Sequence, residues 1–318
     1  MEKAASQFST GTGDSALDRR YLWAREALSE GDPEATIDIL DQTLALVPSF
    51  AAGWHLYGRA QEALGRHEEA ATAWRQCLEA DPGDRLGARL DLARLGAIPA
   101  EEATSEEFSG MLFDGYADRF DSHLVGHLHY NAPALLVDAL ASACNNAGRP
   151  FRFDTVFDLG CGTGLMGEAI RAQAGFLAGC DVSARMVERA RAKTCATGTP
   201  LYDKLAVAGL TDFLASRPEG AADLVIAADV FVYVGDLAPA FAQSVRVLQQ
   251  GGLLAFTVQS HEGEGVIVGE DRRFAHAEGW LRERLGETGL HPVTVTPAST
   301  RQDRGAPVPG LIVLARKD

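Results

Sequence analysis

The sequence predicts an α/β protein, in which a doubly wound, mostly parallel seven-stranded sheet is preceded by a small all-α domain. Two observations carry this prediction. After Met111, seven short apolar runs rich in β-branched residues alternate with helical stretches, the order expected for a parallel sheet with helices on both faces. In the first hundred residues, glycine, leucine and proline recur at a spacing of 34 residues, which indicates stacked helical pairs.

The first segment, residues 1–16, is polar and rich in Gly, Ser and Thr, and we expect it to be a disordered lead-in. It has no apolar core of the kind that a secretory signal carries. The 318 residues are 46% hydrophobic and 23% charged, which is typical of a globular chain long enough for two domains.

Residues 17–98 are predicted to form the helical domain. Three pairs of identical residues lie 34 positions apart: Gly31 and Gly65, Leu44 and Leu78, and Pro48 and Pro82. This period, with Trp54, Gly58 and Ala70 in the second unit, resembles the tetratricopeptide repeat. Because two repeats and a capping helix over residues 85–95 make a short array, we expect the domain to bind a protein partner or to self-associate.

Residues 99–110 are predicted to be a linker, because Pro99 is followed by several glutamates. The second domain, residues 111–318, has predicted strands at 154–159, 176–180, 204–208, 222–228, 252–258, 291–296 and 308–315. Its predicted helices include 165–174, 184–196, 237–249 and 277–288. The last two strands indicate a terminal pair, but which strands they pair with is not visible in the sequence.

A glycine turn follows the first predicted strand, where Val156 to Gly164 reads V-F-D-L-G-C-G-T-G. Glycines at every second position leave the backbone bare, so that a ligand can lie against the main chain beside the amide groups of the next helix. Leu165 stands where the dinucleotide fingerprint G-x-G-x-x-G has its last glycine, which disfavours a nicotinamide or nucleotide-sugar enzyme. The alternative is a tight strand–helix turn that binds nothing.

Two carboxylates follow other predicted strands at the same sheet edge. Asp181 lies 19 residues beyond Gly162, at the end of the second strand, where a carboxylate can accept hydrogen bonds from both ribose hydroxyls. The alternative for Asp181 is a helix cap. Asp229 lies just past the fourth strand and near Tyr233. The alternatives there are a bond from Asp229 to loop amides and a place in the core for Tyr233.

The G-x-G-x-G turn and the sequence D-V-S-A-R-M from Asp181 to Met186 resemble class I S-adenosylmethionine-dependent methyltransferases. Four further segments are similar to a bacterial family of methyltransferases that carry tetratricopeptide repeats: F-D-G-Y-A-D-R-F-D-S-H-L (113–124), A-D-V-F-V-Y-V-G-D-L (228–237), R-F-A-H (273–276) and R-Q-D-R-G-A-P-V-P-G (301–310). The likeness covers nearly the whole chain after residue 16. It implies a Rossmann-like fold, S-adenosylmethionine as methyl donor, S-adenosylhomocysteine as product, and a small-molecule or protein acceptor that it does not identify.

The resemblance also implies the site residues. The cofactor is expected to be bound by Tyr116, Phe120, Asp158, Gly160, Cys161, Gly162, Asp181, Val182, Met186, Leu210, Asp229 and Val230. Candidate general bases are His123, Tyr233 and His276, with ordinary packing as the alternative for each. The family usually has an acid where this chain has Gly209, so adenine would depend on the backbone of Gly209 and Leu210, with Asp212 nearby. Arg301 is expected either to pair with an acidic substrate group or to lie on the surface.

Several function classes are disfavoured. A net charge of −15 with no basic run argues against nucleic acid as a partner, and no apolar stretch is long enough to cross a membrane. Five cysteines without a C-x-x-C pair, and His123 and His127 without an evident third ligand, predict reduced thiols, no metal site and a cytoplasmic protein. The second function considered is a scaffold whose repeats recruit a partner while the α/β domain binds cofactor without turnover.

Overall fold

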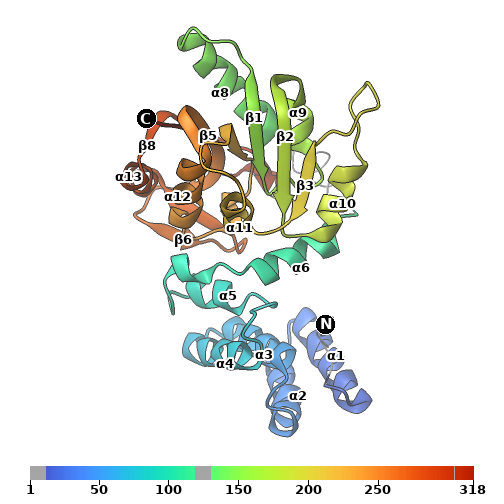
Figure 1. Ribbon diagram of the computed structural model, residues 1–318. Coiled ribbons are helices and arrows are strands. Elements are labelled where there is room, and N and C mark those ends of the chain that lie inside the picture. Colours follow the sequence, from blue (N-terminus) through green and yellow to red (C-terminus); the bar gives the residue numbers. More distant parts are fainter. Residues whose placement is uncertain (1–11, 119–129, 304) are drawn as a thin grey trace. The chain divides into compact units, whose positions relative to one another are not determined.

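A computed structural model describes residues 12–118, 130–303 and 305–318 of the chain (Figure 1). The chain divides into two compact units, Met1–Pro99 and Ala100–Asp318. Among the described residues, no helix combines the length and the apolar character that a membrane span requires.

The first unit is helical. Its described helices are α1 (Ser15–Ser29), α2 (Pro33–Leu46), α3 (Ala51–Ala63), α4 (His67–Ala80) and α5 (Ala88–Arg94). Residues 1–16 were predicted to be a disordered lead-in, but in the described part of this segment α1 begins at Ser15. Asp14 accepts a hydrogen bond from the amide of Ala16 at 2.7 Å and caps α1, so the polar residues before the first helix include its start signal.

Close packing of α3 on α4 depends on small residues, as the repeat pattern indicates. Trp74 is fully buried on α4, and its indole nitrogen donates to the carbonyl of His55 at 3.3 Å. A Cβ on Gly58 would lie only 2.6 Å from Cδ1 of Trp74, so glycine is needed for the indole to fit. Ala70 is also fully buried, and α4 ends at Ala80, two residues before Pro82.

The second unit is built on a sheet whose main path contains seven strands in the order β3-β2-β1-β4-β5-β11-β8. From β3 to β5 all neighbouring pairs are parallel, and β11 is antiparallel to both β5 and β8. The strands are β1 (Phe153–Leu159), β2 (Ala174–Asp181), β3 (Lys204–Val207), β4 (Ala222–Ala227), β5 (Leu248–His261), β8 (Leu290–Ala298) and β11 (Gly310–Lys317). The predicted mostly parallel seven-stranded sheet is thereby confirmed. The two predicted terminal strands are β8 and β11, and β11 lies between β5 and β8.

Helices cover both faces of this sheet. Side chains that alternate along β1, such as Val156 and Phe157, enter two different apolar clusters. One cluster packs against α8 (Ala132–Asn146), α9 (Leu165–Ile170) and α10 (Ala184–Ala192). The other packs against α11 (Leu210–Ala215), α12 (Ala238–Val247) and α13 (Glu278–Thr288). The carboxyl ends of β1, β2 and β4 therefore meet at one edge, with helices above and below.

Residues 100–110, predicted to belong to a linker, form structure of the second unit instead. They contain η1 (Ala100–Ala103) and the start of α6 (Glu106–Tyr116). Ser105 caps α6 by accepting a hydrogen bond from the amide of Phe108 at 3.1 Å. Two glutamates of the acidic run that suggested a linker, Glu106 and Glu107, thus lie in the capped first turn of α6, where negative charge favours the positive end of the helix dipole.

Short elements complete the second unit. The predicted helix 165–174 is divided into α9 and η2 (Arg171–Gln173), and β2 already begins at Ala174. Other short elements are η3 (Phe231–Tyr233), β6 (Val266–Val268), β7 (Phe274–Ala277), β9 (Gln302–Asp303) and β10 (Ala306–Pro307). Strand β7 pairs with the end of β5 in parallel register, which brings Arg273 and its neighbours to the edge where β4 also ends.

Candidate functional site

A cavity of about 360 Å³ lies at the carboxyl ends of β1, β2 and β4. This volume falls within the range of about 300–1,000 Å³ that is usual for small-molecule sites. Nine of the residues predicted to bind cofactor or to act in catalysis line it: Gly160, Gly162, Asp181, Val182, Met186, Leu210, Asp229, Val230 and Tyr233. They come from the ends of four parallel strands, β1 to β4, and from the segments that follow, so the fold brings together residues spread over more than seventy positions of sequence.

The glycine turn after β1 forms one wall of the cavity. Gly160 and Gly162 have φ of 60° and 52°, in the left-handed region that glycine adopts without strain. A Cβ on Gly160 would lie 2.6 Å from Cγ2 of Val230, so a side chain at 160 cannot fit against the segment after β4. Gly164, with φ of 97°, starts α9. The turn therefore needs glycine for its own geometry, and it also presents bare backbone to the cavity.

Asp181 ends β2 and points across to this turn. Its Oδ2 accepts a hydrogen bond from the amide of Gly162 at 2.9 Å, and its Oδ1 accepts one from the amide of Ser183 at 2.8 Å. Burial raises the pKa of Asp181 to about 6, although both amides oppose the rise. The cap of α10 is Ser183, whose hydroxyl accepts a hydrogen bond from the amide of Met186 at 3.1 Å. Asp181 is therefore not the helix cap, and it lines the cavity with a nearly buried carboxylate.

Helix α6 provides the wall next to Asp181. Its Asp114 accepts hydrogen bonds from the hydroxyl of Ser183 at 2.5 Å and from the amide of Arg185 at 3.3 Å. Asp118, just past the helix, forms ion pairs with Arg185 and Arg189 at 2.7 and 2.6 Å. These contacts hold α6 over the start of α10, and α6 in turn contributes Glu106, Ser109 and Phe113 to the cavity lining.

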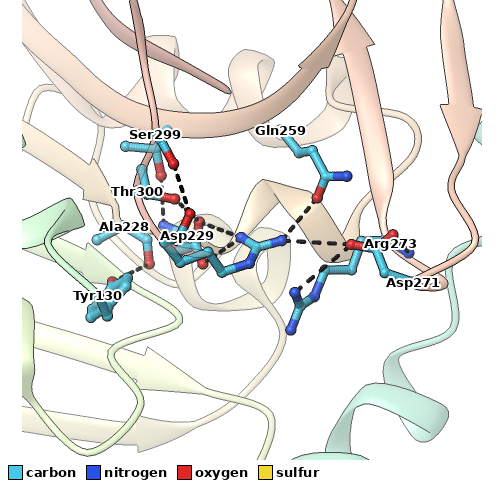
Figure 2. A network of polar contacts seen from close by, with 10 residues as sticks. Tyr130, Ala228, Asp229, Gln259, Asp271, Arg273, Ser299 and Thr300 are labelled. Atoms are coloured by element: carbon cyan, nitrogen blue, oxygen red, sulfur yellow. Dashed lines mark hydrogen bonds and ion pairs between the residues drawn. The ribbon is translucent and has the colours of Figure 1, made fainter. Parts of the chain in front are cut away.

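Asp229 is held by a buried ion pair at the floor of the cavity (Figure 2). Its carboxylate accepts two hydrogen bonds from Nη1 of Arg301, at 3.1 and 2.9 Å, and one from the hydroxyl of Thr300 at 2.9 Å. Its own amide donates to the hydroxyl of Thr257 at 2.8 Å, and its φ of 59° is left-handed. Only 1% of the Arg301 side chain is exposed, and its Nη2 donates to Gln259 at 2.8 Å.

These contacts correct the surface position considered for Arg301. Its side chain is buried, pairs with Asp229 and is not among the residues that line the cavity. The charge on Asp229 is therefore already paired, so this carboxylate is poorly suited to act as a general base. Its paired and strained arrangement fixes the backbone from Ala228 to Val230, both of which line the cavity.

Tyr233 and Arg273 stand together on another part of the cavity lining. The guanidinium of Arg273 lies 5.6 Å from the centre of the Tyr233 ring, and the ring of Phe113 meets Tyr233 edge-on at 4.9 Å. Figure 2 shows Arg273 beside Asp271, with their charged groups 3.8 Å apart. Tyr233 is thus packed by neighbours and still borders the cavity, which fits both a packing role and contact with a bound molecule.

His276, predicted as a candidate base, does not line the cavity. It is fully buried in β7, its Nε2 lies 3.0 Å from the carbonyl of Val234, and its ring is tilted against that of Trp280 with the ring centres 5.4 Å apart. Burial lowers the pKa of His276 to about 4, so the imidazole is neutral at physiological pH. These contacts fit the packing alternative for His276, and a catalytic role stays an untested prediction.

Three predicted cofactor contacts also stand outside the cavity lining. Asp158 is buried at the end of β1, where it accepts a hydrogen bond from the Tyr202 hydroxyl at 2.5 Å. Burial raises the pKa of Asp158 to about 7. The side chain of Cys161 is buried in the apolar cluster of α8 and α9, and Tyr116 ends α6. Two further predicted residues, Phe120 and His123, lie outside the described residues.

Sequence reasoning missed several lining residues, among them Glu101, Thr104, Glu106, Tyr130, Thr211 and Arg273. Asp212, which was expected to lie near the adenine ring of the cofactor, is not among the lining residues. Glu106 is one of them. Segment 273–276 was noticed as a motif, but only the pairing of β7 with β5 shows that Arg273 reaches the site. Within the described parts of the chain, no group of three His, Cys, Asp or Glu side chains could hold a metal ion.

Comparison with known proteins agrees with this geometry. Residues 157–256 match the family described as "Methyltransferase domain", and residues 51–95 match "Tetratricopeptide repeat". A curated relative, the ubiquinone biosynthesis O-methyltransferase of Thiobacillus denitrificans, is 26% identical over 119 residues, which is 37% of this chain. The match spans 50% of that relative's length.

Solved structures share the fold of the second unit. The 1,6-didemethyltoxoflavin-N1-methyltransferase of Burkholderia thailandensis, solved with bound 1,6-didemethyltoxoflavin and S-adenosylhomocysteine, aligns with a TM-score of 0.50 and 16% identity over 66% of this chain and 89% of its own. The [4+2]-cyclase SpnF aligns with a TM-score of 0.52 and 19% identity over 67% of this chain and 96% of its own. The chain thus carries a class I S-adenosylmethionine-dependent methyltransferase domain that follows an N-terminal tetratricopeptide repeat.

Proposed function

We propose that the protein transfers a methyl group from S-adenosylmethionine to a small-molecule or protein acceptor. The observation that carries this proposal is the convergence of the glycine turn, Asp181 and the segment after β4 on one cavity. Family membership of the domain and the fold shared with a methyltransferase crystallised with S-adenosylhomocysteine support the same conclusion. When bound, S-adenosylmethionine would supply an electrophilic methyl group on a sulfonium.

The residues present fit this cofactor. The backbone at Gly160 and Gly162 can approach the amino acid end of a ligand, because no side chain covers it. Asp181 keeps a nearly buried carboxylate at the cavity wall, oriented by two amides, and such an acid can accept hydrogen bonds from a ribose diol. Val182, Met186 and Leu210 provide apolar surface next to it, which suits a purine ring.

The residues beyond the glycine turn would hold the acceptor and exclude water. Asp229, neutralised by Arg301, keeps Ala228 and Val230 in place as a rigid floor. Among the candidate bases that the structure describes, Tyr233 borders the cavity and His276 does not. We assign Tyr233 as the residue that contacts the acceptor, because methyl transfer depends above all on alignment of nucleophile and methyl group. A protonated acceptor would additionally need a group that takes its proton.

Calorimetric titration with S-adenosylhomocysteine tests the proposal. We expect binding by the wild-type protein and its loss in Asp181→Ala, while Asp181→Asn weakens it. Asp203→Asn is the matched control, because Asp203 also accepts a backbone hydrogen bond, from Leu177 at 2.8 Å, but does not line the cavity. Unchanged affinity in Asp181→Ala would refute the ribose assignment.

The second candidate function is a cofactor-binding scaffold that does not turn over. One observation favours keeping it: the fold is shared with SpnF, which is named as a [4+2]-cyclase, so the fold by itself does not fix the chemistry. Incubation of the protein and cell extract with labelled S-adenosylmethionine separates the two. Transfer of label that is lost in Asp181→Ala supports the enzyme, and S-adenosylhomocysteine binding without any transfer supports the scaffold.

We also propose that the repeat domain, residues 17–98, mediates protein interaction or self-association. Leu22, Trp23 and Leu46 are 48, 58 and 66% exposed on α1 and α2, so large apolar side chains of this domain are available for contact with a partner. Sedimentation of the wild-type protein and of a Trp23→Ser variant tests self-association. A concentration-dependent mass that the variant loses is expected, and a monomer at all concentrations would leave only a different protein as partner.

A further inference from the structure

We propose that Glu106 of α6 recognises the exocyclic amino group of the cofactor's adenine ring, and so makes the site selective for 6-aminopurines. This inference rests on the proposed function, because it assumes that a nucleoside occupies the cavity with its ribose at Asp181. Glu106 belongs neither to the glycine turn nor to a strand end, since it precedes β1 by more than forty positions, so the motifs of the sequence do not place it in the cavity.

The position of Glu106 follows from the order of the strands. Gly160 follows β1, Asp181 ends β2, and Leu210 follows β3, which pairs with the outer side of β2. A ligand that extends from the glycine turn past Asp181 therefore reaches the end of β3 next. At that end the cavity is lined by Val182, Leu210 and Glu106. The base of a nucleoside is the part that would lie there.

Glu106 and Gly209 are complementary. A Cβ on Gly209 would lie 2.7 Å from Cδ of Glu106, and closer still to its oxygens, so the carboxylate fills the space in front of this glycine. Gly209 has an extended backbone, with φ of −64°, which any residue can adopt. Its lack of a side chain therefore serves to admit the Glu106 carboxylate to the end of β3.

The carboxylate of Glu106 has no cation to neutralise it among the described residues. Burial raises the pKa of Glu106, and the neighbouring acids Asp212 and Glu107 add to the rise. A carboxylate in such a place gains from a neutral hydrogen-bond donor. Adenine offers one in its 6-amino group, whereas a 6-oxo purine presents an acceptor at that position.

Apolar contacts alone would not distinguish purines. Val182, Met186 and Leu210 can cover any base, because every purine has the same flat apolar faces. A carboxylate at the ring edge adds a polar contact that a base without a donor leaves unfilled, and an unfilled polar group weakens binding. Selectivity at this site is therefore assigned to Glu106.

The test compares S-adenosylhomocysteine with its 6-deamino analogue, in which purine replaces adenine, by calorimetric titration of the full-length protein. We expect the wild-type protein to prefer S-adenosylhomocysteine about 10-fold, the size expected for one hydrogen bond to a charged group. Glu106→Ala should bind both ligands with nearly equal affinity, and Glu106→Gln should keep part of the preference. Glu107→Ala is the matched control, since the adjacent glutamate does not line the cavity, and it should keep the full preference.

Two further variants keep the inference testable if Glu106→Ala is unstable. Gly209→Ala should abolish the preference in the presence of Glu106, because the new Cβ displaces the carboxylate. Glu106→Ala combined with Gly209→Asp should restore it, because the carboxylate then reaches the same space from the other side. An unchanged preference in Glu106→Ala would overturn the role of Glu106 alone. Failure of the wild-type protein to bind S-adenosylhomocysteine would instead overturn the proposed function.

Discussion

Replacing Arg301 by methionine should destabilise the second unit strongly, although the change adds apolar surface. The substitution removes two hydrogen bonds to Asp229, at 2.9 and 3.1 Å, and one to Gln259 at 2.8 Å. It leaves the Asp229 carboxylate, which is 12% exposed, with the hydroxyl of Thr300 as its side-chain partner. Breaking a buried ion pair from one side costs about 3–5 kcal/mol, because the remaining charge stays buried without compensation.

The matched control is Arg316→Met. Arg316 is also near the C-terminus and pairs with Asp318, but both side chains are more than half exposed, at 54 and 57%. An exposed pair of this kind contributes about 0–1 kcal/mol. The double variant Asp229→Asn with Arg301→Met removes both charges, and we expect it to be more stable than Arg301→Met alone.

Hydrogen exchange followed by mass spectrometry measures these effects within the intact chain. Peptides from β4 and β5 report opening of the sheet around Asp229, and peptides from α3 and α4 provide an internal reference, because the repeat unit is separate. The opening free energy of β4 and β5 should fall by about 3–5 kcal/mol in Arg301→Met. A loss of no more than that of Arg316→Met would refute the claim that the pair is buried and coupled.

Three more predictions follow from single side chains. Because the pKa of Asp158 is raised from 3.8 to about 7, the folded protein binds this proton more tightly than the unfolded chain, and stability falls as pH rises through that interval. Asp158→Asn should therefore gain up to about 4 kcal/mol relative to wild type above pH 7 and lose this gain near pH 4, as urea unfolding would show. Gly160→Ala should lower the free energy of unfolding by about 1–2 kcal/mol because its backbone is left-handed, and by a further amount because the new Cβ clashes with Val230. Thermal melting should show that adding Val230→Ala recovers only the part due to the clash. Tyr233→Phe should slow labelled-methyl transfer about 100-fold with unchanged S-adenosylhomocysteine affinity, because the acceptor loses a contact that aligns it. His276→Gln should instead lower the melting temperature without that selective loss.

The part of the cavity that Gly160, Gly162 and Asp181 line was largely predictable, because its signals are local in sequence. Gly160 and Gly162 form one turn, and Asp181 ends the next strand, so the alternation of strands and helices already places them at one edge. The cofactor contact expected at Asp158 stays a prediction. Its buried carboxylate accepts a hydrogen bond from Tyr202, and Asp158 is not among the residues that line the cavity.

The remaining contacts depend on pairings that no local pattern shows. Arg301 and Asp229 are 72 residues apart in the sequence. They meet because β5 extends beyond the end of β4 to Gln259, and because the segment that contains Arg301 follows β8 in the same sheet. A lone arginine in a C-terminal segment gives no sign of burial before that topology is known. Glu106 was likewise misassigned, since an acidic run after Pro99 fits a linker as well as a capped helix.

This difference between the two ends of the cavity bears on what the protein methylates. Backbone turns and strand ends build the end of the cavity at Gly160 and Asp181, and these belong to the fold, which proteins only 16–19% identical to this chain share. Side chains from separate segments build the other end, including Thr104, Tyr130, Tyr233 and Arg273. Because that end can change without altering the fold, structural likeness extends to a cyclase as well as to methyltransferases. The acceptor must therefore be sought through Tyr233 and Arg273, by variants that change transfer but not cofactor affinity.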